Sequence, residues 1–467
     1  MYGCPSCGGG LRFDIKSQEL KCDYCDSQFD PYSISKEKDA QTDTEFGVTV
    51  FKCPQCGGEV MTTDESITGF CSFCGASTIL DGRMETTRRP KKIITFKKTK
   101  EDCKEIYKRM AGRAIFAPKE LKDPQYLEKF RGIYIPYWVY DISYKDSVDI
   151  NATTSERDGD TVITNFYDIT FDLDAEYNGV SYDASASFDD HISETIAPFP
   201  AEHMQEFTPS FLSGFYADTA DVDKEIYRSD AVEAARTGIV NGISEVPELA
   251  GYTYGDLNNT EANRTATETA TGEPNLALFP VWFLSYKTKN NRVAYAVVNA
   301  ENGEISADLP VDVKKYVIAS MALAAPIFLL LNFLFTLTPK VDLIVSIIFS
   351  LITIFVYRGE MKEINDRHAR YDDRGFYSKY GSDFAHNEEK TVKSGPGIIG
   401  SIIAIIISVA VLIIRPADDF YYYIAAIVSI IGIIITISAI IRRFNILTTR
   451  PFPSFLGRKG GNDSAKD

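Results

Sequence analysis

The sequence predicts a multidomain protein made of two small cysteine-rich modules, an α+β domain with an antiparallel sheet, and a C-terminus of four transmembrane helices. Three observations lead to this prediction: a duplicated cysteine pattern in the first 80 residues, an acidic, strand-rich middle, and four uncharged apolar runs after residue 315. At roughly 150 residues per domain, the length of 467 residues fits several folded units and excludes a single small domain.

The cysteine pattern occurs twice. Eight of the nine cysteines form C-x2-C pairs, with 14 residues between the two pairs of each copy. The cysteines are Cys4, Cys7, Cys22 and Cys25 in residues 1–30, and Cys53, Cys56, Cys71 and Cys74 in residues 49–80. Four thiolates close a tetrahedral shell around Zn²⁺ and leave no position for a substrate. The sequence therefore predicts two Cys4 zinc ribbons, each with a structural Zn²⁺ that supplies the folding energy so small a module lacks.

Two other interpretations of the cysteine pairs stay open from the sequence alone. A rubredoxin-like iron site uses the same kind of turn, and disulfides would require an oxidising compartment. The ninth cysteine, Cys103, follows a candidate helix cap at Thr99 and shares helical spacing with Ile106 and Met110. We expect it to be a small buried residue of a helix rather than a reactive thiol.

The four apolar runs predict transmembrane helices, because about 20 apolar residues cross the hydrocarbon core of a bilayer. The predicted spans are residues 316–337, 341–357, 397–414 and 420–441. The uncharged part of the second range begins at Leu343, after Asp342, and the other three ranges contain no charged residue. Pumps and ion-coupled transporters place ionisable groups at membrane depth, so a transport function is disfavoured.

The distribution of lysine and arginine predicts the orientation. Eight basic residues lie in 358–393, and basic pairs flank the outer ends of the first and last spans, whereas the other two connections hold only Lys340 and Arg415. By the positive-inside rule, the region before residue 316, the loop 358–396 and the tail 442–467 are cytoplasmic. Metal-binding thiolates favour the same reducing side. The expected location is the cell membrane, multi-pass, with both termini cytoplasmic and without a cleavable signal peptide.

The middle of the chain is expected to contain a basic helical linker at residues 83–125 and an acidic α+β domain at residues 126–312. Asn302-Gly303 between two apolar runs is typical of a hairpin turn. Trp138 and Trp282 each follow a proline by two positions and precede a Ser-Tyr-Lys triplet. We hypothesise that they mark two related strands of one antiparallel sheet, each with its indole in the core.

Charge and motifs limit the function classes. The net charge is -16 overall and -22 for residues 141–310, and residues 1–82 hold six basic against 13 acidic side chains. The ribbons thus lack the basic face that phosphate binding requires, and nucleic acid is disfavoured as a partner. The nucleophile elbow, the phosphate-binding loop and the H-E-x-x-H motif are all missing from the sequence. We therefore predict no catalytic or cofactor-binding residues, and we interpret Asp189, Asp190 and His191 as a surface loop.

The order of these parts resembles a bacterial family of membrane-anchored zinc-ribbon proteins of the transcription-factor-IIB type, the YdjG-like membrane-stress adaptors. The segments that carry the resemblance are the paired ribbons and residues 116–121 (FAPKEL), 134–141 (YIPYWVYD), 207–218 and 279–282 (FPVW). The resemblance implies a membrane adaptor that recruits phage-shock-protein-A-like or SPFH-type scaffold proteins to the inner leaflet.

Together these observations favour a non-enzymatic integral membrane adaptor or scaffold whose cytoplasmic ribbons and acidic domain dock soluble proteins, in a membrane-stress response. The expected partners are the lipid bilayer and cytoplasmic scaffold proteins. Membrane anchoring would raise the local concentration of anything the ribbons hold. The alternatives are a membrane regulator that binds nucleic acid through its ribbons, and a transporter or enzyme of a type that the motifs do not reveal.

Overall fold

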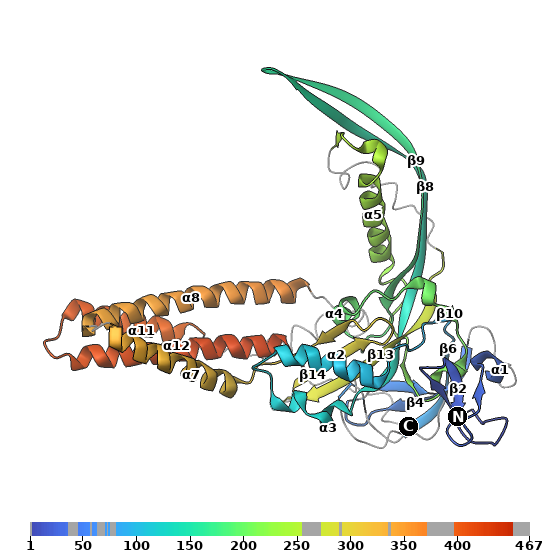
Figure 1. Cartoon of the computed structure of the whole chain (residues 1–467), viewed down its shortest axis with the longest axis horizontal. Coiled ribbons are helices and arrows are strands. Elements are labelled where there is room, and N and C mark those ends of the chain that lie inside the picture. The colour runs from blue at the N-terminus through green and yellow to red at the C-terminus, as the bar shows by residue number, and fades with distance from the viewer. Residues whose placement is uncertain are drawn as a thin grey trace, which may run out of the picture.

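The computed structural model describes residues 2–35, 45–56, 58–62, 71, 73–74, 81–254, 272–288, 292–334, 338–370 and 397–451. Three parts extend in different directions: a sheet-based body, a long hairpin arm, and a bundle of apolar helices (Figure 1). The first ribbon, marked by β2 and α1, lies at the end of the molecule opposite the apolar helices (Figure 1).

The strands form a small sheet and a large one. The small sheet is β1 (Leu11–Asp14), β2 (Glu19–Cys22) and β3 (Gln28–Phe29). In the described part of the chain the large sheet has 13 strands, in the order β10-β7-β13-β8-β11-β5-β4-β6, with β9 and β12 on β8, β14 on β13, and β15 and β16 on β14. These strands are β4 (Glu45–Lys52), β5 (Glu59–Thr62), β6 (Asp81–Arg88), β7 (Lys92–Ile93), β8 (Arg131–Asp158), β9 (Thr161–Asp183), β10 (Gln205–Glu206), β11 (Tyr216–Asp218), β12 (Thr253–Tyr254), β13 (Asn275–Lys287), β14 (Arg292–Asn299), β15 (Ile305–Ala307) and β16 (Arg450–Pro451).

The two tryptophan strands, β8 and β13, are antiparallel neighbours at the centre of the large sheet. Trp138 pairs with Leu276 and Trp282 pairs with Gly132. Both indoles are buried, and each donates a 2.9 Å hydrogen bond to a backbone carbonyl. The hypothesis of paired strands with both tryptophans in the core is confirmed.

Both faces of this central pair are covered. Tyr134 and Trp138 point into hydrophobic clusters on one face, whereas Ile135 and Phe279 point into a separate cluster on the other. A strand that is buried on both faces has a nearly continuous apolar sequence. This explains why β13 is buried at ten consecutive positions.

Helix α2 (Lys100–Arg113) begins as predicted. The Thr99 side chain accepts a hydrogen bond from the backbone N–H of Asp102, and the Asp102 carboxylate accepts one from the backbone of Thr99. Cys103 is fully buried in the main core, which raises the pKa of its thiol. The expectation of a buried cysteine on a capped helix is confirmed. The other helices of the body are α1 (Pro31–Ser35), α3 (Pro124–Leu127), α4 (Asp190–Thr195) and α5 (Arg228–Ser244).

The basic segment 83–125 differs from the predicted helical linker. Its first part belongs to strand β6, which pairs with β4 along eight residues, and to strand β7, which pairs with β10 and β13. Helix is limited to α2, the short α3 and a single 3-10 turn. The neighbouring strands decide the difference, because a segment that completes an open sheet edge gains backbone hydrogen bonds whatever its charge.

The hairpin arm was not predicted. Strands β8 and β9 stay paired from Tyr137 and Asp183 out to a turn at Gly159, whose φ is +60°. The arm projects from the body with α5 beside it (Figure 1). Residues 141–183 contain 11 acidic and two basic side chains. Near the tip, Phe166 is 81% exposed, and Val162 and Ile163 are also exposed.

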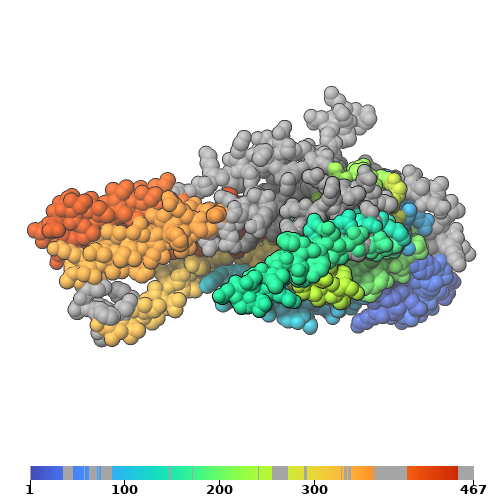
Figure 2. All heavy atoms as spheres, turned by 90° about the horizontal axis from the view of Figure 1, so that it is seen from above, coloured from blue at the N-terminus to red at the C-terminus, as the bar shows by residue number. Residues whose placement is uncertain are grey.

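Four apolar helices follow the body, and Figure 2 shows α8, α11 and α12 as a lobe at one end of the molecule. They are α7 (Val313–Leu334), α8 (Pro339–Arg370), α11 (Ile399–Ile414) and α12 (Phe420–Leu447). They overlap the four predicted spans, and residues 335–337 of the first span lie outside the described residues. Within the described part, two helices are long and apolar enough to cross a membrane, namely Pro339–Gly359 of α8 and all of α12, and α11 is a shorter apolar helix. The predicted loop 358–396 begins as helix, because α8 runs on to Arg370.

Helices α11 and α12 pack through small and polar residues and expose their apolar ones. The buried hydroxyl groups of Ser401 and Thr436 lie 2.7 Å apart, and those of Ser408 and Ser429 lie 3.0 Å apart. The backbones approach closely at Gly432, where a Cβ atom would lie 2.6 Å from a backbone oxygen of the facing helix. Small residues and paired hydroxyls inside, with isoleucine outside, are typical of helix packing in lipid.

Candidate metal centres

The first cysteine group is assembled by two turns of the small sheet. Cys4 and Cys7 lie in the turn before β1, Cys22 ends β2, and Cys25 lies in the turn after it. The Sγ atoms of Cys4 and Cys25 are 3.6 Å apart, and those of Cys7 and Cys22 are 3.5 Å apart. Gly8 has a φ of +76°, which a residue with a side chain rarely adopts. This glycine allows the tight turn that aims both thiols of the first pair inward.

The second group repeats this geometry. The Sγ atoms of Cys53 and Cys74 are 3.8 Å apart, and those of Cys56 and Cys71 are 3.6 Å apart. In both groups the backbone N–H two residues after the second cysteine lies 3.4 Å from that cysteine's Sγ. The two copies of the C-x2-C motif therefore have the same local geometry, as expected from their identical cysteine spacing.

Both groups fit a tetrahedral metal ion. Four sulfurs at about 2.3 Å from a central Zn²⁺ lie about 3.8 Å from one another, and the four Sγ–Sγ distances given above are 3.5 to 3.8 Å. All four ligand atoms of each group lie within 4.8 Å of one another, and the cysteines are not joined by disulfide bonds. Four thiolates this close repel each other unless a cation holds them. Each group can thus hold a metal ion as a closed Cys4 shell, and zinc and iron share this geometry.

The two groups differ in their surroundings. In the first, Cys7 and Cys25 are exposed to solvent, whereas all four cysteines of the second are buried. The difference extends to equivalent neighbours: Tyr24, between Cys22 and Cys25, is 82% exposed, and Phe73, between Cys71 and Cys74, is 1% exposed. Phe73 packs edge-on against Phe283 of strand β13.

Ser27 gives the first group a further distinction. Its hydroxyl lies 3.2 Å from the Sγ of Cys25. Hydrogen bonds from Ser27 lower the pKa of the Cys25 thiol to about 6. Ser27 therefore favours the ionised form of the exposed Cys25 thiol. In the second copy the equivalent position is Ala76, which cannot donate such a bond.

The two ribbons are integrated into the body and are not independent domains. In the first, the backbone N–H of Phe13 donates to the carbonyl of Ser213 at 3.0 Å, and the amide of Gln18 donates to the carbonyl of Phe96 at 2.8 Å. In the second, β4 and β5 are strands of the large sheet, and β5 pairs with β11. The cysteine groups therefore sit on a shared core.

A partly buried ion cluster that the sequence did not reveal lies beside Tyr295, which contacts the second group. The guanidinium of Arg450 donates to both carboxylate oxygens of Asp189, at 2.8 and 2.9 Å, and also to Asp308. Burial alone would raise the pKa of Asp189, but Arg450 holds it below its ordinary value. Burial raises the pKa of Asp308. The interpretation of Asp189 as part of a surface loop was wrong, because this residue caps α4 and holds Arg450. No local pattern signals a pair 261 positions apart.

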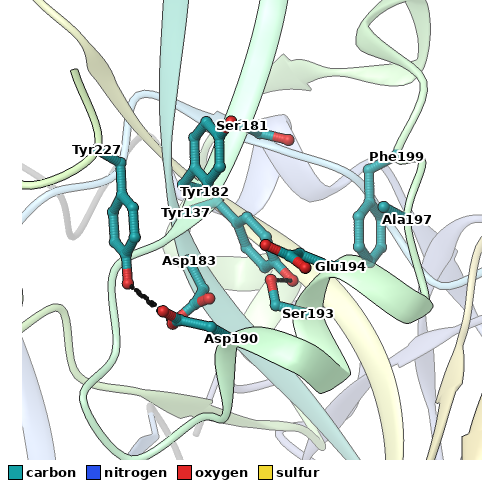
Figure 3. A pocket seen from close by; sticks show the side chains of 10 residues that line it. All are labelled: Tyr137, Ser181, Tyr182, Asp183, Asp190, Ser193, Glu194, Ala197, Phe199 and Tyr227. Atoms are coloured by element: carbon teal, nitrogen blue, oxygen red, sulfur yellow. Dashed lines mark hydrogen bonds between the residues drawn. The ribbon is translucent and has the colours of Figure 1, made fainter. Parts of the chain in front are cut away.

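A cavity of about 190 Å³ is lined in part by residues of α4 (Figure 3). Its lining combines aromatic rings with carboxylates and contains no basic residue: Tyr137, Ser181, Tyr182, Asp183, Asp190, Ser193, Glu194, Ala197, Phe199 and Tyr227. The hydroxyl of Tyr227 donates to the carboxylate of Asp190 at 2.8 Å. Burial, together with neighbouring carboxylates, raises the pKa of Glu194. The cavity is acidic and lies outside both cysteine groups.

The chain is similar to a protein of Bacillus subtilis (strain 168) named "Uncharacterized protein YdjG". The two are 24% identical over 335 residues, which cover 71% of this chain and 96% of the relative. No family model matches the chain, and no solved structure matches it. The similarity agrees with part of the resemblance inferred from the motifs and carries no activity with it.

Proposed function

We propose that the chain is a non-enzymatic membrane adaptor that holds two structural Zn²⁺ ions, crosses the membrane four times, and presents its ribbons and acidic arm to soluble cytoplasmic proteins. Zinc is preferred over iron because a closed thiolate shell with a structural role needs no redox chemistry. Scaffold proteins of the phage-shock-protein-A-like or SPFH type are the proposed partners, on the resemblance alone.

The packing of α11 and α12 supports the membrane part of this proposal. A pair of helices that buries serine, threonine and glycine while exposing isoleucine would aggregate in water but is stable in lipid. The alternation of basic and non-basic connections supports four spans with both termini in the cytoplasm. Reporter fusions after residue 467 and within residues 338–342 test the topology. A tail reporter that is active outside the cell would contradict it.

The rigid attachment of the body to the helices is the observation that carries the adaptor proposal. Asn445, near the end of α12, exchanges two hydrogen bonds with the backbone of Val311, at 2.7 and 2.8 Å. At the start of α7, the Lys315 ammonium donates to the carbonyl of Ala117. The strand β16 beyond α12 adds to the large sheet by pairing with β14. The body therefore contacts the helices both where the chain enters α7 and where it leaves α12. These contacts would hold the body in a fixed orientation at the membrane, as an adaptor requires.

Two exposed aromatic side chains mark the surfaces proposed for docking. They are Tyr24 on the first ribbon and Phe166 near the tip of the arm, 82% and 81% exposed. Exposed aromatic residues are frequent anchors of protein interfaces. The carboxylates of the arm would favour a partner with a basic face.

Co-purification from solubilised membranes tests the docking role. Deletion of the ribbons is unsuitable because they share the core of the body, so full-length Tyr24→Ser and Phe166→Ser variants are compared with wild type. Ile115→Ser is the matched control, since the Ile115 side chain is 74% exposed and belongs to neither of the two proposed docking surfaces. We expect at least one variant to lose the scaffold protein that wild type and the control retain. Equal recovery from all four proteins would contradict docking through these surfaces.

A further inference from the structure

We infer that metal binding by the second cysteine group is coupled to the seating of the last membrane helix, through Tyr295 and Arg450. This inference rests on the proposed function, because it requires a metal in the second group and a membrane around α12. It adds a regulatory link between two parts that the proposal treats separately.

The first contact joins the cysteine group to the large sheet. The hydroxyl of Tyr295, on strand β14, donates a 2.9 Å hydrogen bond to the backbone carbonyl of Phe73. Phe73 lies between the ligands Cys71 and Cys74 and is 1% exposed. A buried carbonyl that loses its hydrogen-bond donor is destabilised, because no water molecule replaces the lost hydrogen bond. The turn that carries two ligands is therefore held in place by Tyr295.

The second contact joins Tyr295 to the end of α12. The guanidinium of Arg450 lies 5.6 Å from the centre of the Tyr295 ring, in cation–π position. Arg450 is three residues beyond Leu447, the last residue of α12. Asp308, which accepts from Arg450, also accepts from the backbone N–H of Tyr295 at 2.9 Å. Tyr295 thus stands between the metal ligands on one side and the end of a membrane helix on the other.

A third set of contacts joins the end of α12 to strand β14. Arg292, at the start of β14, donates to the side chain of Thr449 and to the backbone carbonyls of Ile446 and Thr449. Displacement of α12 along or across the membrane would therefore pull Arg450 away from Asp189, Asp308 and Tyr295 together. The first ribbon is held by different partners. Its residues Phe13 and Gln18 bond to Ser213, Phe96 and Thr95.

Coupling of this kind is reciprocal. If a seated helix end strengthens metal binding by the second group, the bound metal strengthens the seating by the same factor. A change in membrane tension that displaces α12 would then weaken metal binding by the second group and expose its buried thiolates. The first group, in the same chain, would not respond.

Thiol footprinting of the full-length, zinc-loaded protein in nanodiscs tests this inference. Each protein is incubated with a chelator and an alkylating reagent, and the modification of every cysteine is followed by mass spectrometry. The variants are Arg450→Gln, which removes the charged link, and Tyr295→Phe, which keeps the ring and removes only the hydroxyl. Arg442→Gln is the matched control, because Arg442 is an exposed arginine close to the same helix end.

We expect Cys56 and Cys71 to be modified at least about fivefold faster in both variants, the lower end of typical coupling between sites. The rates at Cys7 and Cys25 should match wild type, and Arg442→Gln should leave all rates unchanged. No acceleration in Tyr295→Phe, or equal acceleration at both groups, overturns the coupling while the adaptor proposal stands. Wild-type protein that purifies without metal overturns both.

Discussion

The two cysteine groups share ligands, spacing and local geometry but occupy different environments. The first lies at the periphery, with two of its four cysteines in contact with solvent. The second lies inside the body and is linked through Tyr295 to Arg450, just beyond α12. Tyr24 and Phe73 occupy equivalent positions and show the contrast most clearly, being 82% and 1% exposed. The same ligand geometry therefore occurs both at the surface and inside the body.

Loss of one ligand should have the largest effect and should be unequal. Cys74→Ser removes a buried ligand from a ribbon whose strands belong to the large sheet, and because metal binding is part of the folding energy, we expect the apparent melting temperature to fall by about 10 °C or more. The equivalent Cys25→Ser change, at an exposed ligand, should lower it by less than half as much. Zinc analysis and thermal unfolding of both variants provide the measurement. Cys103→Ala is the control, since it should keep two bound metal ions, and equal losses at the two groups would remove the contrast.

The equivalent aromatic residues should differ by several kcal/mol. Truncation of a buried phenylalanine leaves a cavity, so Phe73→Ala is expected to lower the free energy of unfolding by about 3 to 5 kcal/mol. Tyr24→Ala, at an exposed position, should stay within about 0.5 kcal/mol of wild type. Denaturant unfolding at a fixed zinc concentration measures both values. A large loss for Tyr24→Ala would mean that the first ribbon is also embedded.

Thiol reactivity should separate the groups by about one order of magnitude. In zinc-loaded protein treated with a chelator and an alkylating reagent, Cys7 and Cys25 should be modified at least about tenfold faster than the buried cysteines, because reagents reach exposed thiolates first. Mass spectrometry of the cysteine peptides gives each rate. Unfolded protein supplies the reference, in which the two groups should react alike. Slower reaction of Cys7 and Cys25 than of Cys53 and Cys56 would contradict the assigned environments.

The smallest effect should come from Ser27→Ala, which makes the first group resemble the second at the position of Ala76. Ser27 lowers the pKa of Cys25 to about 6, so at pH 7 this thiol is mostly ionised in metal-free protein. Without the hydroxyl the pKa rises towards its ordinary value, the thiolate fraction at pH 7 falls, and alkylation of Cys25 should slow by about threefold. The difference should vanish well above pH 9, where the thiol is ionised in both proteins. Ser6→Ala, in the neighbouring turn, is the control and should react like wild type.

The features that the sequence predicted are those whose physical cause is local. Cysteine spacing defines a ligand turn within four residues, and the Thr99 cap, the Asn302-Gly303 turn and the apolar runs likewise act over short stretches of chain. The paired tryptophan strands were found because the sequence repeats a context around Trp138 and Trp282. The metal-ligand sets predicted from spacing are the sets that the structure brings within 4.8 Å.

The features that sequence reasoning missed depend on distant partners. The strands at residues 81–93 form because β4, β10 and β13 offer open edges, and the arm is long because β9 follows β8 in register for almost its whole length. Arg450 and Asp189 meet across 261 positions. Such contacts leave no periodic pattern in either segment.

By itself, the sequence determined which atoms can bind metal and which stretches avoid water, because ligand spacing and hydropathy act within a turn or a helix. The tertiary structure alone decided that one cysteine group would be buried and the other exposed. It also decided that Tyr295 would lie between the buried group and Arg450, just beyond the end of α12. Burial and contact between remote segments follow from how the strands and helices pack together, which the two nearly identical cysteine motifs do not encode.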